Sequence, residues 1–348
     1  MKLSLKHIYL YSLIGLGAST LASCDSFLDR EPITSVTPEA YFSTVDQVGA
    51  YVINYYSWLQ NSRGQSLFHD KNWRSGMTLN DNNTDNLFSQ SGDLNYFAGE
   101  KLVPAGKNFE TYYSRIRTWN WLLEQILPKE EAGTIQGDEA TLKHYIGEAY
   151  FFRALAYYQA LVRYGDFPII DEVLPDDQAI LKELSQRAPR NEVARFIISD
   201  LDKAYAYMSD VDMATTRINK DAAMLVKSRV ALFEATWLQN FKGTAFVPGG
   251  EGWPGASLHN NYQYPSGNLD NEVKYFLEQA VEASKLVADK YKGNLTENTG
   301  VLQQSADDPS NPYFDMFAQE DLSDVKEVLL WQEAGTEKRS QPSAGNEA

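Results

Sequence analysis

The stretch that decides the fold is "YIGEAYFFRALAYYQALVRYGDFPII", residues 145–170. With Leu142 before it, apolar and small side chains recur every three or four residues, at Tyr145, Ala149, Phe152 and Ala156. This period is typical of one face of an α-helix. The stripe loses its apolar character near Arg163, and we expect Gly165 and Pro168 to end the helix.

The same period appears in further segments on both sides of this stretch. It predicts helices over 45–59, 109–126, 193–208, 223–241 and 273–291. Ser43 and Asp46 have the spacing of a capping box before the first of these. Small residues such as Gly147 would let neighbouring helices approach closely, which is typical of tetratricopeptide-like hairpins, although their repeat of about 34 residues is not kept.

We therefore expect a mainly all-α fold, built from tetratricopeptide-like helical hairpins with long irregular loops and few short strands. The clearest strand is "EVLLWQE", residues 327–333. The longest insertions are 61–106 and 242–269, which are rich in Gly, Asn, Ser, Asp and aromatic residues and lack a sustained period. Compact domains keep loops of this length chiefly where the loops are functional.

The N-terminus has the composition of a secretory signal. Lys2 and Lys6 precede an apolar stretch, Ile8 to Ala18, which is shorter than the roughly 20 residues of a spanning helix. The chain contains 1 cysteine, Cys24, directly after this stretch. The alternative to an ordinary cleavage site at residues 21–23 is that "LASC" resembles the lipobox of bacterial lipoproteins, which implies that Cys24 is lipidated and anchors the chain to a membrane.

Charge and cysteine content limit the function classes. The formal net charge is −16, with 31 Lys and Arg against 47 Asp and Glu. So acidic a chain is a poor partner for nucleic acid or for anionic lipid headgroups. A lipidated Cys24 would leave no thiol for a disulfide, so the fold must be stabilised by packing.

The ordered blocks of sequence resemble the SusD/RagB-type proteins, which are outer-membrane glycan-binding lipoproteins of Bacteroidetes. The blocks are "CDSFLDREP", "RTWNWLLEQI", "YIGEAYFFRALAYYQALVRYGDFPII", "APRNEVARFIISDLDKAYAYM" and "KDAAMLVKSRVALFEATW". The resemblance implies a scaffold of four tetratricopeptide-like units whose loops bind an oligosaccharide. It also implies a partner, a SusC-like TonB-dependent transporter, and an outer-membrane location facing the cell exterior.

The resemblance also implies a domain organisation. Residues 1–23 are expected to be a lipoprotein signal peptide and residues 24–348 a SusD-like domain. Family members usually run well past the end of this chain, so we expect the domain to be truncated at its C-terminal end.

Rings in the two long loops are the candidate ligand-binding residues. The apolar face of a pyranose stacks on Trp or Tyr, while its hydroxyl groups need polar side chains nearby. The first loop offers Trp73 with Asn72, Arg74 and Asp81, and the second offers Trp253, Tyr262 and Tyr264. The alternative for each ring is packing back onto the scaffold, which we expect for the helical residues Trp119, Trp121 and Trp237.

Catalytic and metal motifs are weak. The 4 histidines lack metal-ligand spacing, and "GEGWPG" at 250–255 lacks the strand and helix of a dinucleotide site. "SDVK" at 323–326 lacks the companion motifs of serine acylating enzymes. "DNNTDN" at 81–86 has neither the Gly nor the Glu of an EF-hand loop, so a looser calcium site there is an alternative to a solvated turn. We expect no cofactor and no resident metal.

Three hypotheses from different classes remain. The first is a non-catalytic glycan-binding lipoprotein that delivers its ligand to a transporter. The second is a helical repeat scaffold that binds a peptide or protein. The third is a hydrolase with a carboxylate pair, whose spacing the sequence cannot supply.

Overall fold

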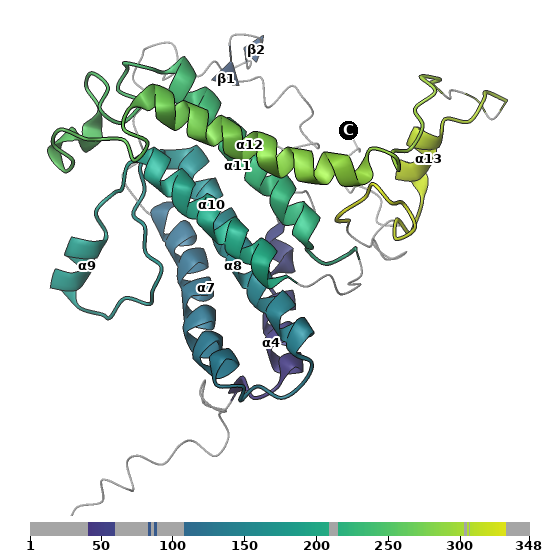
Figure 1. Cartoon of the computed structure of the whole chain (residues 1–348), viewed down its shortest axis with the longest axis horizontal. Coiled ribbons are helices and arrows are strands. Elements are labelled where there is room, and N and C mark those ends of the chain that lie inside the picture. Colours follow the sequence, from purple (N-terminus) through teal and green to yellow (C-terminus); the bar gives the residue numbers. More distant parts are fainter. Residues whose placement is uncertain are drawn as a thin grey trace, which may run out of the picture. The chain divides into compact units, whose positions relative to one another are not determined.

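The computed structural model of the 348-residue chain describes residues 41–59, 83–84, 87–88, 108–208, 215–302, 305 and 307–331. The chain divides into two compact units, Met1–Phe42 and Ser43–Ala348, and all that follows concerns the second. Its elements, labelled in Figure 1, are α4 (Val45–Ile53), η1 (Tyr56–Leu59), β1 (Asn83–Thr84), β2 (Leu87–Phe88), α7 (Asn108–Glu131), α8 (Glu139–Tyr164), α9 (Gln178–Leu184), α10 (Arg190–Tyr207), α11 (Lys220–Asn240), η3 (Pro254–Ser257), α12 (Leu269–Tyr291) and α13 (Pro312–Ala318). The predicted mainly α fold is confirmed.

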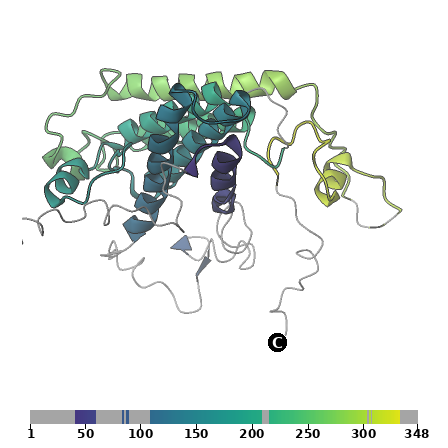
Figure 2. The same cartoon turned by 90° about the horizontal axis from the view of Figure 1, so that it is seen from below.

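The long helices pack in sequence order, α7 on α8, α8 on α10, α10 on α11 and α11 on α12. Each neighbouring pair is antiparallel. On α7 and α8, for example, Arg115 bonds Gln159 while Trp119 stacks on Phe152, so residue numbers rise on one helix as they fall on the other. Figure 2 shows α12 at one edge of this stack. The predicted helical hairpins are therefore present.

Each long helix buries the stripe that its sequence predicts. Trp119 is fully buried and lies parallel to Phe152, with ring centroids 4.9 Å apart. Gly147 lets α8 approach α10, since a Cβ atom on it would lie 2.6 Å from Cγ of Met208 and 2.9 Å from the Ala204 carbonyl oxygen. The packing role expected of Trp119 and the close approach expected at Gly147 are both observed.

Helix α8 ends where the sequence predicts. Gly165 caps it with a φ of +71°, a left-handed conformation that glycine adopts without steric cost, and its N–H donates to the Leu161 carbonyl. At the start of α4 the capping box is shifted by one residue from the prediction. It consists of Thr44 and Gln47 rather than Ser43 and Asp46, because the longer Gln47 side chain reaches the backbone N–H groups of both Ser43 and Thr44.

The strand predicted at 327–333 is wrong for residues 327–331, and residues 332–333 lie outside the described chain. The segment's polar groups bond the start of α11 instead of a neighbouring strand. The Trp331 N–H donates to the Thr215 carbonyl (3.1 Å), and the Leu329 carbonyl accepts from Asn219 Nδ2 (2.7 Å). The strands that the structure does describe are β1 and β2, an antiparallel pair within the insertion 61–106.

Within the described ranges, none of the helices combines the length and the apolar character of a membrane span.

Candidate functional site

The loop between α11 and α12 carries three of the predicted site residues and folds back onto the helices. Trp253 is only 5% exposed, and its indole Nε1 donates to Oδ2 of Asp166 at 2.7 Å. Asp166 follows the cap of α8, and its Oδ1 accepts from the backbone N–H of Arg190 at 2.9 Å. In this arrangement Trp253 therefore fixes the loop to the starts and ends of the helices.

The two tyrosines of the same loop are half-buried and also bonded. The Tyr262 hydroxyl donates to Oδ1 of Asn191 at 3.0 Å and accepts from its Nδ2 at 2.9 Å. The Tyr264 hydroxyl donates to the Pro248 carbonyl at 2.5 Å. Burial is the main reason why the pKa of each phenol lies well above its ordinary value. Both hydroxyl groups therefore stay protonated at neutral pH and serve as neutral hydrogen-bonding groups.

Four rings of this loop form a cluster, which we call the loop ring cluster: Trp253, His259, Tyr262 and Tyr264. Trp253 stacks on His259 with centroids 5.8 Å apart, and Tyr262 lies 5.6 Å from Trp253 and 5.1 Å from Tyr264. Nε2 of His259 lies 2.8 Å from the Arg187 carbonyl, which can only accept, so this nitrogen carries the proton. The partly exposed members, His259, Tyr262 and Tyr264, present rings and polar atoms together.

Charge pairs lie beneath the loop ring cluster. Arg195 donates to both carboxylate oxygens of Glu272, at 2.7 and 2.8 Å, and Asn191 and the Ser266 N–H donate to the same group. Burial raises the pKa of Glu272, but these bonds outweigh it, so the pKa of that carboxyl is below its ordinary value. The ionised Glu272 therefore holds the end of the loop to α10.

A second buried pair joins α10 to α11. Arg190 Nη2 donates to Oε2 of Glu234 at 2.8 Å, and neither side chain is appreciably exposed. Burial raises the pKa of the Glu234 carboxyl, against the opposing effect of the Arg190 charge. The Arg190 guanidinium also lies over the Trp237 ring, 4.1 Å from its centroid. These contacts give the loop a rigid base.

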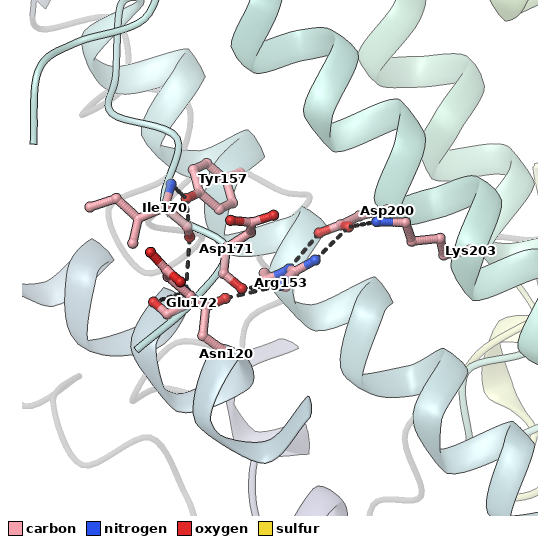
Figure 3. Close-up of polar contacts among 8 residues, drawn as sticks. All are labelled: Asn120, Arg153, Tyr157, Ile170, Asp171, Glu172, Asp200 and Lys203. Atoms are coloured by element: carbon pink, nitrogen blue, oxygen red, sulfur yellow. Dashed lines mark hydrogen bonds and ion pairs between the residues drawn. The ribbon is translucent and has the colours of Figure 1, made fainter. Parts of the chain in front are cut away.

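The segment that carries Asp166 is held by the polar network of Figure 3. Arg153 on α8 donates to both carboxylate oxygens of Asp200, at 2.7 and 2.8 Å, to Oδ1 of Asn120 at 3.0 Å and to the Asp171 carbonyl at 3.3 Å. Burial lowers the pKa of Arg153, but the hydrogen bonds and charge of Asp200 outweigh it, so the pKa of the guanidinium is raised. One buried cation thus joins α7, α8, α10 and the segment after α8.

Two neutral side chains complete this network. Asn120 Nδ2 donates to the carbonyls of Ile170 (2.9 Å) and Glu172 (3.0 Å). The Tyr157 hydroxyl donates to the Ile170 carbonyl at 2.8 Å and accepts from the Ile170 N–H at 2.7 Å. The irregular backbone that follows Gly165 is therefore bonded as fully as a regular element, and Asp166 is fixed with it.

A comparison of the sequence with known families decides the relationship. Residues 26–232 match the SusD-like family whose description is "Starch-binding associating with outer membrane". The chain belongs to the SusD-like family. The outer-membrane association and the starch binding in this description are properties of the family.

Curated SusD-like relatives come from Formosa agariphila. SusD-like protein P25 is 24% identical over 231 residues, which is 62% of this chain and 41% of that protein. SusD-like protein P2 is 25% identical over 237 residues, 66% of this chain and 44% of that protein. The aligned part of the chain therefore spans less than half the length of these relatives.

Solved structures of SusD-like proteins are also similar to this chain. A SusD-like protein from Bacteroides fragilis has 25% identity and a TM-score of 0.44, covering 61% of this chain and 39% of that one. A SusD homolog from Bacteroides thetaiotaomicron has 18% identity and a TM-score of 0.46, covering 76% of this chain and 44% of that one.

The predicted site residues of this SusD-like chain fall into two groups. Trp253, Tyr262 and Tyr264 are brought together by the loop ring cluster. The other candidates lie outside the described residues, and their roles stay predictions: Asn72, Trp73, Arg74, Asp81 and the lipidation site Cys24.

Sequence reasoning missed the residues that hold the loop ring cluster in place. His259, Asn191 and Asp166 were not among the candidates. For Asp166 the signal was available, because it follows Gly165 in the block "RYGDFP", where a polar side chain after a helix cap needs a partner. Asn191 lies in the first turn of α10 and resembles an ordinary helix-start residue, so its bond to Tyr262 is visible only in the structure.

The SusD-like chain also has an open pocket of about 500 Å³ beside α13. Its lining is mainly polar and includes Thr296, Asp315, Met316, Gln319 and Lys326. Among the residues that the structure describes, no group of three or more His, Cys, Asp or Glu side chains is placed to hold a metal ion. Of the possible calcium segment 81–86, the structure describes Asn83 and Thr84, which form β1.

Proposed function

We propose that the chain is a cell-surface lipoprotein that captures an oligosaccharide or polysaccharide and delivers it to a partner SusC-like TonB-dependent transporter. The observation that carries this proposal is the match of residues 26–232 to a family described as starch-binding and associated with the outer membrane. The family is one of binding proteins, so the proposed activity is binding without catalysis.

The loop ring cluster supports a carbohydrate ligand. Tyr262 and Tyr264 are half-buried rings with neutral hydroxyl groups, and His259 lies beside them. Such rings stack on the apolar face of a pyranose, while amide and hydroxyl groups satisfy its hydroxyls. The buried charge pairs below hold the cluster in one geometry, which lowers the entropy cost of binding.

Anchoring at Cys24 completes the proposal. A lipid-modified cysteine after the signal would keep the binding loops at the membrane surface, next to the transporter. Metabolic labelling with an alkyne fatty acid should mark the protein, and Cys24→Ser should abolish the label. Protease treatment of intact cells should degrade the wild-type protein if it faces the exterior; full protection would contradict that location.

Affinity electrophoresis tests the binding function. The full chain is run through gels that contain starch, xyloglucan or other plant, microbial and host polysaccharides, and reducing ends are assayed in parallel. Retardation without new reducing ends is expected. New reducing ends that vanish on a single Asp or Glu substitution would favour a hydrolase, and specific retention of a peptide with no effect of sugars would favour the peptide-binding scaffold. EDTA should leave retardation unchanged, because we propose no cofactor; a loss of retardation that calcium restores would favour the calcium site at Asp81.

The transporter partner is tested in the outer membrane. Crosslinking in cells that express both proteins, followed by purification through a tag on the chain, should recover the SusC-like transporter. Its absence from the crosslinked product would contradict delivery while leaving glycan binding intact.

A further inference from the structure

A second row of rings lies on the surface, separate from the loop ring cluster. Tyr158 on α8 meets Phe233 on α11, and the row continues through Trp237, Phe241 and Phe246, with successive centroids 5.9, 5.9, 4.5 and 5.4 Å apart. The middle three are spaced by four residues, so they share one face of the helix. We call these five side chains the ring ladder.

The ring ladder is open outwards and supported inwards. Phe246 is 60% exposed, and the other four rings are half-buried. On the inner side, the buried guanidinium of Arg190 lies 4.1 Å from the centroid of Trp237. Trp237 Nε1 donates to the Phe246 carbonyl at 3.0 Å, which fixes the outermost ring relative to the helix. A run of five adjacent surface rings exceeds what scattered exposed apolar residues explain.

The chemistry of the ring ladder selects its ligand. The ladder residues are uncharged, and the nearest buried cation, Arg190, is already paired with Glu234. The net charge of −16 disfavours anionic polymers and anionic lipids. Aromatic faces carry a negative quadrupole that attracts the C–H groups of a pyranose. Asn240 is exposed three residues after Trp237, so an amide for sugar hydroxyl groups lies on the same side of α11.

We propose that the ring ladder is a carbohydrate platform that takes neutral, dissolved glycan chains, in addition to the loop ring cluster. This inference rests on the proposed glycan-binding function. The ring planes of the α11 residues and Phe246 differ by 37°, 43° and 68° from one ring to the next. Such rings do not form the flat surface that a crystalline polysaccharide needs, whereas a flexible single chain can follow them.

Isothermal titration of the full chain with soluble starch and with xyloglucan, and a pull-down with microcrystalline cellulose, test the platform. The variant is Phe246→Ala, whose exposed ring contributes little to folding and whose backbone carbonyl remains available to Trp237. The matched control is Phe317→Ala on α13, which removes an equally exposed ring, 66% exposed, outside the ladder. Thermal unfolding of both variants should match the wild type.

The expected result is that Phe246→Ala weakens binding of a soluble glycan about tenfold, while Phe317→Ala leaves it unchanged and neither protein binds cellulose. Unchanged affinity of Phe246→Ala, equal losses in both variants, or binding of the wild type to cellulose alone would each overturn the platform. If the wild type bound none of the polysaccharides, the proposed glycan-binding function would fail as well, and this outcome differs from failure of the platform alone.

Discussion

Replacement of Trp253 by Phe separates a structural role of this ring from a ligand-stacking role. Phe keeps an aromatic side chain in the buried site but removes the indole N–H that donates to Asp166 at 2.7 Å. The acceptor is a carboxylate with one remaining donor, the Arg190 N–H at 2.9 Å. We therefore expect the loop to lose an anchor while the ring stays in contact with its neighbours.

The magnitude follows from the charge of the acceptor. A hydrogen bond to a charged group contributes about 1.5–3 kcal/mol to stability, and leaving a partly buried acceptor unsatisfied costs a similar amount. Trp253→Phe should therefore lower the free energy of unfolding by about 2 kcal/mol at neutral pH. The smaller ring adds a cavity contribution of about 1 kcal/mol.

The pH dependence gives the prediction its sign. Burial raises the pKa of Asp166, and the Trp253 and Arg190 N–H groups lower it, so the variant should raise it further. A carboxyl whose pKa is raised by folding contributes stability below its unfolded pKa and loses it as pH rises through the folded pKa. The deficit of Trp253→Phe should therefore be largest near neutral pH and shrink on acidification.

Urea unfolding followed by circular dichroism, at about pH 7 and about pH 4, measures both quantities. The matched control is Trp331→Phe, which removes an indole donor to a neutral acceptor, Oγ1 of Thr215 at 2.8 Å, and should show no such pH dependence. Unchanged stability of Trp253→Phe together with weaker glycan binding would refute the reasoning, because Trp253 would then meet the ligand rather than hold the loop.

Three further predictions concern the scaffold. Asp200→Ala should destabilise the chain by about 3–5 kcal/mol, because it leaves the buried Arg153 without its carboxylate, whereas the double change Arg153→Met with Asp200→Leu should recover most of the loss; additive losses in urea unfolding would contradict this. Gly147→Ala should cost about 1–3 kcal/mol by the same measurement, since the new methyl group would overlap Met208, and an unchanged midpoint would show that α8 and α10 separate without cost. The pKa of Glu272 is below its ordinary value, so its contribution is present above the unfolded pKa and lost as pH falls through the folded one; hydrogen exchange in the following helix turn and the loop should accelerate in acid, and Glu272→Gln should remove this step.

Much of the helical scaffold could be predicted because its signal is local. The period of three and four residues identified the long helices, and Gly165 marked the end of α8 through its backbone freedom alone. The seven-residue helices α9 and α13 were missed because two turns are too short to establish a period. The strand predicted at 327–331 failed because β-propensity is realised only when a neighbouring strand accepts the backbone bonds.

The candidate site divides in the same way. The composition of the loop between α11 and α12 identified Trp253, Tyr262 and Tyr264 as residues outside any helical stripe, but composition does not say which rings are covered. Trp253 is buried because Asp166, more than eighty residues earlier, accepts its N–H. The ring ladder was equally hidden, since its members come from α8, α11 and the loop.

By itself the sequence determined the helical elements, their buried stripes and membership of the SusD-like family, because periodicity and ordered motifs are properties of neighbouring residues. Only the tertiary structure decided which rings are open to a ligand and which ion pairs are buried beneath them. Burial and hydrogen-bond partnership depend on contacts between residues that are distant along the chain, such as Arg153 with Asp200 and Asn191 with Tyr262.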